Sequence, residues 1–135
     1  EAEAATLLSD LGIEEELHEK QMSELESGQK IRILLAQALF GNPDVLLLDE
    51  PTASLDPETG NFIRSFLESY TKQKKVSILL ASHNMEEVKR LCTSVMMMKN
   101  GKIIDQGAPS ELIKKHGRKN LEEVFLKLAG AEHEF

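Results

Sequence analysis

With 135 residues, of which 41% are hydrophobic, the chain is long enough to bury the core of one domain. Its formal net charge of -7 comes from interleaved acidic and basic residues, which argues against a basic nucleic-acid-binding module. No apolar stretch approaches the roughly 18 residues that a membrane-spanning helix needs. The single cysteine, Cys92, excludes an internal disulfide.

The first third of the chain carries two apolar patterns with helical spacing. The first runs from Glu1 to Leu11 and ends at Gly12, which suits a left-handed helix end. The second follows Ser27-Gly28-Gln29 and ends near Phe40. Ser27 and Gly28 would lie at the amino end of that helix, where unpaired N–H groups and the helix dipole favour an anion such as phosphate. The alternative is a plain serine N-cap without a ligand.

Four aliphatic residues, 45–48, run directly into Asp49, Glu50 and Pro51. A short, unbroken apolar run is typical of a strand that is buried on both faces of a parallel sheet. Open α/β sheets bind ligands beyond the carboxyl ends of their strands, which is where the two carboxylates stand. If the chain stays extended, their side chains diverge, so that one can hold a cation while the other orients a water. The alternative is a strand that simply ends in polar residues.

The rest of the chain repeats this alternation of helix and strand. Asp56-Pro57 predicts a helix start, because aspartate caps helices and proline suits the first helical position. Residues 76–81 predict a second buried strand, which delivers Ser82-His83 to the same sheet edge. Asn100-Gly101 predicts a two-residue hairpin turn between strands 95–99 and 102–106. Two helices follow, at 109–115 and 121–128, and a frayed end is expected over 131–135.

Four of these patterns, in this order, resemble the second half of an ATP-binding cassette (ABC) nucleotide-binding domain. They are a signature motif, Leu25-Glu26-Ser27-Gly28-Gln29; a Walker B strand ending in Asp49-Glu50; a D-loop, Ser54-Leu55-Asp56; and a switch histidine, His83. The resemblance implies the carboxyl-terminal part of a P-loop NTPase domain, with a mostly parallel sheet flanked by helices and a terminal β-hairpin and helices. Its expected parts are a signature region (about 1–41), an α/β core (about 42–99) and the hairpin with its helices (about 100–135).

The resemblance also implies a role for each site residue. Asp49 would hold Mg²⁺ through water, Glu50 would polarise the attacking water, and His83 would contact the γ-phosphate of ATP. Ser27, Gly28 and Gln29 would contact ATP on the opposite subunit, and Ser54 and Asp56 would cross to that subunit. The implied partners are a second nucleotide-binding subunit, identical or not, and membrane permease subunits, with no nucleic acid. The implied location is the cytoplasmic face of the membrane, reached through the permease.

Two departures from the family pattern bear on activity. Glu26 stands where the family has serine, and its carboxylate would repel a triphosphate. No Gly-x-x-x-x-Gly-Lys-Ser/Thr loop occurs in the 135 residues. We therefore expect that the chain is the carboxyl-terminal part of a longer transport ATPase, and that this part by itself is inactive. The alternatives are a non-transport ABC ATPase of translation or DNA repair, and a degenerate subunit that completes a partner's ATP site.

Overall fold

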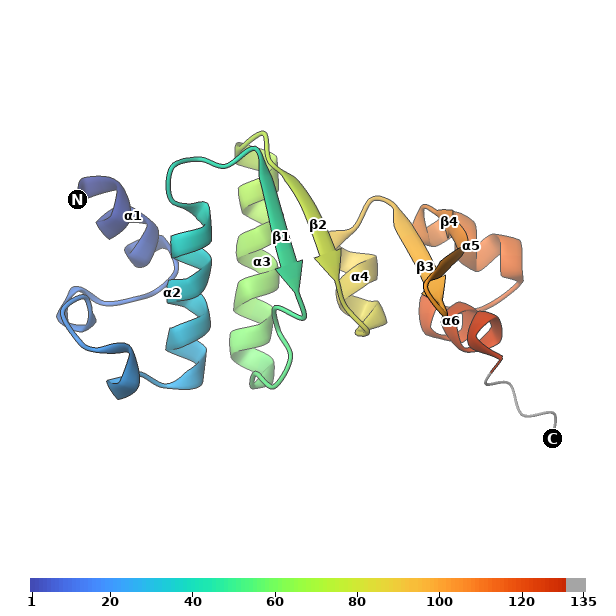
Figure 1. The fold of residues 1–135 in the computed structure, drawn as a ribbon, viewed down its shortest axis with the longest axis horizontal. Helices are drawn as coiled ribbons and strands as arrows, with labels where there is room; N and C mark the ends of the chain where they lie inside the picture. The colour runs from blue at the N-terminus through green and yellow to red at the C-terminus, as the bar shows by residue number, and fades with distance from the viewer. Residues whose placement is uncertain (131–135) are drawn as a thin grey trace. The chain divides into compact units, whose positions relative to one another are not determined.

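The computed structural model describes residues 1–130, which form two compact units divided between Ala81 and Ser82 (Figure 1). The first unit contains α1 (Ala2–Asp10), the short 3₁₀ turns η1 (Glu15–Leu17) and η2 (Met22–Glu24), α2 (Ser27–Leu39), β1 (Val45–Asp49), α3 (Pro57–Gln73) and β2 (Ser77–Ala81). The second contains α4 (Met85–Leu91), β3 (Val95–Lys99), β4 (Lys102–Gly107), α5 (Pro109–His116) and α6 (Leu121–Ala129). The expected frayed end lies outside the described residues.

The sheet of the first unit is the predicted parallel pair. β1 and β2 pair in register from Val45 with Ser77 to Asp49 with Ala81. Parallel pairing places both carboxyl ends at one edge, as the sequence pattern predicted. The α/β class is therefore confirmed, although the described residues divide their strands between this parallel pair and a separate antiparallel pair, β3 with β4.

The prediction that β1 and β2 are buried on both faces is wrong. In β1 the side chain of Leu46 is 4% exposed, whereas that of its neighbour Leu47 is 70% exposed. In β2, Leu79, which pairs with Leu47, is 55% exposed. A parallel sheet is buried twice only when helices cover both of its faces. Among the described residues of this unit, only one face of the two-stranded sheet is covered.

Arg32 ties the helices of the first unit together. Its Nη1 donates to the carbonyl of Leu11 at 3.0 Å, and its guanidinium lies 4.1 Å from the centre of the Phe62 ring. These contacts join the end of α1 to α2 and α3. Gly12 is required beside them, because its φ is +76° and an added Cβ would stand 2.5 Å from Nη1 of Arg32. The predicted left-handed glycine after α1 is confirmed.

The second unit is built around a hairpin and three helices. Asn100 and Gly101 have φ values of 51° and 72°, which confirms the two-residue turn. The core of the unit consists of side chains from α4, β3, α5 and α6, namely Val88, Val95, Met97, Leu112, Leu121 and Val124. None of the described helices is long and apolar enough to cross a bilayer.

A charged cluster fixes the end of α5 to β4. Asp105 Oδ2 lies 2.6 Å from His116 Nε2, and Asp105 Oδ1 lies 2.9 Å from Lys115 Nζ. Hydrogen bonds from Lys115 and His116 lower the pKa of the Asp105 carboxyl from 3.8 to about 2. The cluster therefore depends on an ionised Asp105.

Candidate functional site

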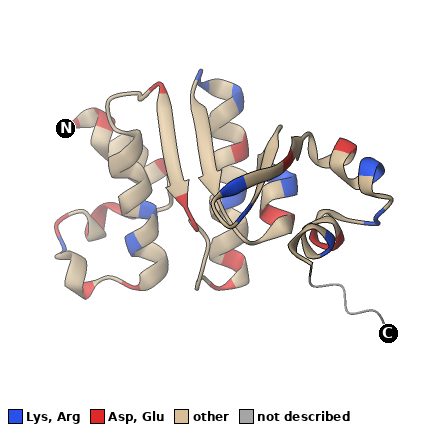
Figure 2. Cartoon of the chain, turned by 45° about the vertical axis from the view of Figure 1, so that its right-hand side comes forward, with Lys and Arg blue, Asp and Glu red and all other residues tan. Residues whose placement is uncertain are grey.

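The carboxyl end of β1 carries the two predicted carboxylates, and the ribbon in Figure 2 turns red there. Asp49 is exposed and is the last paired residue of the strand. The N–H of Glu50 donates to the carbonyl of Ala81 at 2.8 Å, but Glu50 has a left-handed φ of 47°. The chain therefore does not stay extended at Glu50. The expectation that the side chains of Asp49 and Glu50 diverge as on an extended strand is wrong. The turn begins at Glu50 itself.

Backbone strain is concentrated in the loop that follows β1. Among residues 1–130, four residues other than glycine have positive φ: Asn42, Glu50, Ser54 and Asn100. Asparagine adopts this conformation readily, whereas for glutamate and serine it costs about 1–2 kcal/mol of conformational free energy each. Both of these less usual residues are predicted site residues. Such strain persists where surrounding structure holds it, and it concentrates at functional sites.

The loop is held by contacts that the sequence did not reveal. Thr52 is 8% exposed, and its hydroxyl oxygen accepts a hydrogen bond from Arg64 Nη2 of α3 at 3.1 Å. The N–H of Ala53 donates to the carbonyl of Glu50 at 3.1 Å. These bonds fix the loop between β1 and α3. No local sequence pattern marks Arg64 as the donor to Thr52, because the two residues are twelve positions apart.

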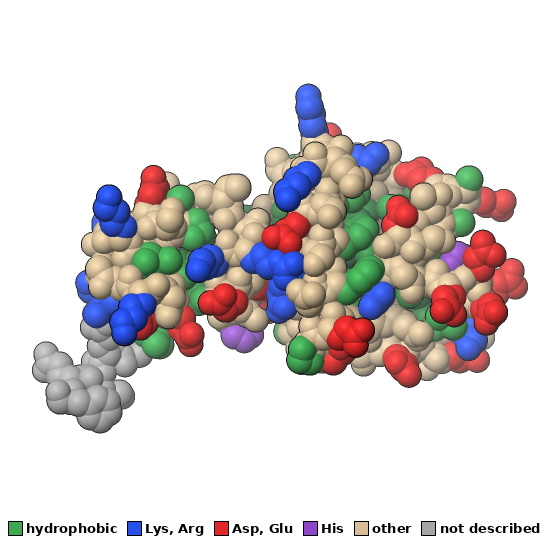
Figure 3. Space-filling view, turned by 180° about the vertical axis from the view of Figure 1, so that it is seen from behind, with side chains coloured by type: hydrophobic (Ala, Val, Ile, Leu, Met, Phe, Trp, Pro, Cys, Tyr) green, Lys and Arg blue, Asp and Glu red, His purple; other side chains and the backbone are tan. Residues whose placement is uncertain are grey.

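Glu26, and not Ser27, is the N-cap of α2. The alternative of a serine N-cap is therefore wrong, because Ser27 is the first residue of the helix. The Glu26 carboxylate makes no cap hydrogen bond, while the N–H of Glu26 donates to Gln29 Oε1 at 3.0 Å. Gln29 thus closes the start of the helix, which leaves the exposed Glu26 side chain unconstrained by the cap. Residues 14–26 are rich in acids, and Figure 3 shows acidic side chains over this part of the first unit.

The starts of α2 and α3 lie against one another. A Cβ added to Gly28 would stand 3.3 Å from both Cγ2 and Oγ1 of Thr59, so only a glycine permits this approach without displacement. Asp56 caps α3, as predicted, by accepting the Thr59 N–H at 2.9 Å on Oδ2. Hydrogen bonds from Thr59 lower the pKa of Asp56. Two helix amino ends, which favour anions, therefore meet where the signature and D-loop patterns stand.

The structure brings most of the predicted site to one side of the first unit. In Figure 1 the amino ends of α2 and α3 and the carboxyl end of β1 all lie on the same side of it. Ser27, Gly28, Gln29, Asp49, Glu50, Ser54 and Asp56 belong to these segments. His83 belongs to the second unit, where it is exposed between Ser82 and Asn84, the N-cap of α4.

The donors at the end of β1 suit a hard cation. Among the described residues no group of three or more histidine, cysteine and acidic side chains could hold a metal ion. Mg²⁺, however, binds through one or two carboxylates, retained waters and phosphate oxygens, and needs no complete protein cage. The exposed Asp49 beside Glu50 offers such oxygen ligands. The residues therefore fit Mg²⁺ that arrives with a polyphosphate.

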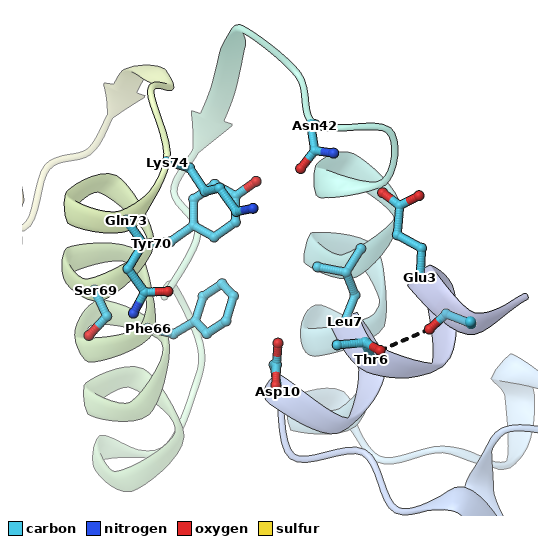
Figure 4. A pocket seen from close by; sticks show the side chains of 11 residues that line it. Glu3, Thr6, Leu7, Asp10, Asn42, Phe66, Ser69, Tyr70, Gln73 and Lys74 are labelled. Carbon is cyan, nitrogen blue, oxygen red and sulfur yellow. Dashed lines mark hydrogen bonds between the residues drawn. The ribbon is translucent and has the colours of Figure 1, made fainter.

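A cavity of about 570 Å³ lies elsewhere in the first unit, between α1 and the end of α3 (Figure 4). Phe66 and Tyr70, with ring centres 5.8 Å apart, face Leu7 and Asp10 across it. None of the predicted site residues lines this cavity. It is distinct from the end of β1 at which the carboxylates stand.

The sequence is similar to that of known ATP-binding proteins of ABC transporters. The family model described as ABC transporter matches residues 1–53. The methionine import ATP-binding protein MetN 2 of Staphylococcus epidermidis is 46% identical over 90 residues, which cover 67% of this chain and 26% of that protein. MetN of Escherichia coli K12 is 39% identical over 121 residues, which cover 90% of this chain and 35% of that protein. The chain thus spans about a third or less of these curated relatives.

Solved structures give the same result for the fold. The structure of cbiO1 from Clostridium perfringens, part of the ABC transporter complex cbiONQ, matches with a TM-score of 0.73 and 36% identity, over 85% of this chain and 45% of that one. A dimeric ATP-binding cassette in a post-hydrolysis state, bound to ADP and Pi, matches with a TM-score of 0.71 over 79% of this chain and 46% of that one. Its 24% identity supports the fold alone.

Proposed function

Because this chain belongs to the ABC transporter family of ATP-binding proteins, we propose that it provides the water-activating and signature parts of a transport ATPase. The phosphate-binding loop of that ATPase would come from outside these 135 residues, which do not contain its motif. The observation that carries the proposal is the strained turn at Glu50, next to Asp49 and on the side of the unit where α2 and α3 begin. Members of this family are ATPases, and this arrangement suits their chemistry.

The proposed reaction is transfer of the γ-phosphoryl group of ATP to water. Little covalent work falls to the protein, so positioning and charge stabilisation supply most of the acceleration. Glu50 orients and polarises the attacking water. The turn at Glu50 directs its side chain away from the regular strand alternation, and the Thr52–Arg64 bond keeps that turn in place.

Asp49 is the proposed Mg²⁺ ligand, through water. The metal would neutralise charge on the β- and γ-phosphates, which two adjacent carboxylates would otherwise repel. His83 is assigned to a γ-phosphate contact by its match to the family motif. It directly precedes Asn84, the N-cap of α4, which ties its backbone to the start of that helix.

The proposed partners are a second nucleotide-binding subunit and a membrane permease. Ser27, Gly28 and Gln29 would serve ATP held by the opposite subunit, and Ser54 and Asp56 would reach toward it. The close approach of Gly28 to Thr59 supports this, because it places the start of α2 beside the start of α3, which Asp56 caps. The acidic surface around residues 14–26 disfavours nucleic acid as a partner. The proposed location is the cytoplasmic face of the membrane, through the permease.

The decisive experiment is Glu50→Gln in the intact ATPase. A positioned base contributes on the order of 10²–10⁴ in rate, so hydrolysis should fall by about that factor while Mg-ATP binding is unchanged. Glu58→Gln is the matched control, because Glu58 is an exposed glutamate in the first turn of α3. Turnover by the Glu50→Gln enzyme within about threefold of wild type would contradict the proposal and favour the degenerate subunit.

A further inference from the structure

Glu87 is a buried acid beside the switch-histidine turn. Its side chain is 1% exposed, although it lies on a short surface helix, α4. The hydroxyl of Ser82 donates to Glu87 Oε2 at 2.8 Å. A buried carboxylate is costly unless it is hydrogen-bonded, so this bond offsets a real penalty.

The bond belongs to a closed network around His83. The Ser82 hydroxyl oxygen also accepts the N–H of Asn84 at 3.1 Å. Asn84 Oδ1 in turn accepts the N–H groups of Glu86 at 3.1 Å and Glu87 at 3.2 Å. Ser82 and Asn84 flank His83, so both of its chain neighbours are fixed to the start of α4.

Helix capping alone does not explain this arrangement. Asn84 by itself satisfies the first N–H groups of α4, which is all that an N-cap requires. The Ser82–Glu87 bond is additional to this cap. It joins the residue before His83 to α4, the helix after it. A buried network in which every polar group has a partner holds its members in one geometry.

We propose that Ser82 and Glu87 are positioning residues, which hold the backbone of His83 so that its exposed ring keeps one direction. This inference rests on the proposed function of His83. The pair does not touch the nucleotide. Its effect is to lower the freedom that His83 must lose when it contacts the γ-phosphate.

The first measurement is hydrogen exchange in this chain. Ser82→Ala removes the acceptor of the Asn84 N–H, so exchange of that amide should accelerate about tenfold, while Ser82→Thr, which keeps a hydroxyl, should stay within about threefold of wild type. Ser94→Ala is the matched control, at an exposed serine of the same unit. An unchanged Asn84 exchange rate in Ser82→Ala would overturn the network.

The second measurement is steady-state hydrolysis by the intact ATPase. Ser82→Ala should lower kcat about tenfold with little change in KM, Ser82→Thr should restore it, and Glu87→Gln, which preserves side-chain shape, should lie between them. In a His83→Ala background, Ser82→Ala should have no further effect. Multiplicative losses would show that Ser82 acts independently of His83 and would overturn the inference.

A wrong role for His83 and a wrong positioning role for Ser82 and Glu87 would give different results. If His83→Ala leaves hydrolysis unchanged, the proposed function of His83 is wrong and the inference falls with it. If His83→Ala abolishes hydrolysis while Ser82→Ala and Glu87→Gln both retain wild-type kcat, the positioning role alone is wrong.

Discussion

Replacing Gly28 by alanine should destabilise this chain, even though alanine is the better helix former. The added Cβ would meet Cγ2 and Oγ1 of Thr59 at 3.3 Å, closer than ordinary van der Waals contact. Neither helix start yields easily, because Asp56 caps α3 and Gln29 closes the first turn of α2. The contact is therefore expected to strain one of the two turns.

The magnitude follows from two opposing effects. Overpacking of a tight contact costs about 1–3 kcal/mol, whereas glycine to alanine within a helix gains up to about 1 kcal/mol. The net loss should be about 1 kcal/mol. Thr59→Ala removes both close atoms and leaves the Thr59 Cβ, which lies 3.8 Å from the added atom. In that background Gly28→Ala should become stabilising, which corresponds to a coupling energy of about 1–2 kcal/mol.

The assay is urea unfolding of the wild type, the two single variants and the double variant. Because Thr59→Ala also removes a side-chain bond to Asp56, only the difference across the cycle is interpreted. Thr71→Ala, at the opposite end of α3, provides a control background in which Gly28→Ala should remain destabilising. Equal effects of Gly28→Ala in the wild-type and Thr59→Ala backgrounds would refute the contact between the starts of α2 and α3.

Glu26, Asp105 and the nucleotide site can each be tested separately. Glu26→Ser should raise the unfolding free energy of this chain by about 1 kcal/mol, because serine can supply the cap bond that Glu26 does not make. The same change should tighten ATP-driven dimerisation of the intact ATPase several-fold. If the unfolding free energy and the dimer affinity both stay unchanged, Glu26 is a neutral surface acid. Since the pKa of Asp105 is lowered to about 2, the stability that its carboxylate contributes to the fold should be complete above pH 3.8 and be lost toward pH 2. Asp105→Asn should therefore flatten the dependence of the urea midpoint on pH between pH 3.8 and pH 2. Parallel curves for the wild type and the variant would contradict this. Calorimetry of this chain with Mg-ATP should show no dissociation constant below about 1 mM, and micromolar binding would mean that the site is complete without the phosphate-binding loop.

Several features were determined by the sequence because they depend on neighbouring residues. Asp56-Pro57 starts α3 through a cap and a fixed φ that any chain with these two residues can use. Asn100-Gly101 tolerates positive φ at both turn positions, so the hairpin is encoded in two residues. Parallel pairing of β1 with β2 followed from two apolar runs separated by a helix. The order of the site motifs, and hence the family, is visible along the chain without any tertiary contact.

Only the tertiary structure decided how these pieces meet. The left-handed turn at Glu50 is held by the Thr52–Arg64 bond, which no local pattern encodes. Gly28 reads as a helix residue in the sequence, whereas in space it permits Thr59 to approach. From the sequence, Glu87 would be taken for an exposed surface acid. In the structure it is buried on α4, where its carboxylate accepts a hydrogen bond from the Ser82 hydroxyl. Each of these depends on contacts that form only when the helices and loops pack together, and burial of Leu46 but not of Leu47 likewise depends on which face of the sheet is covered.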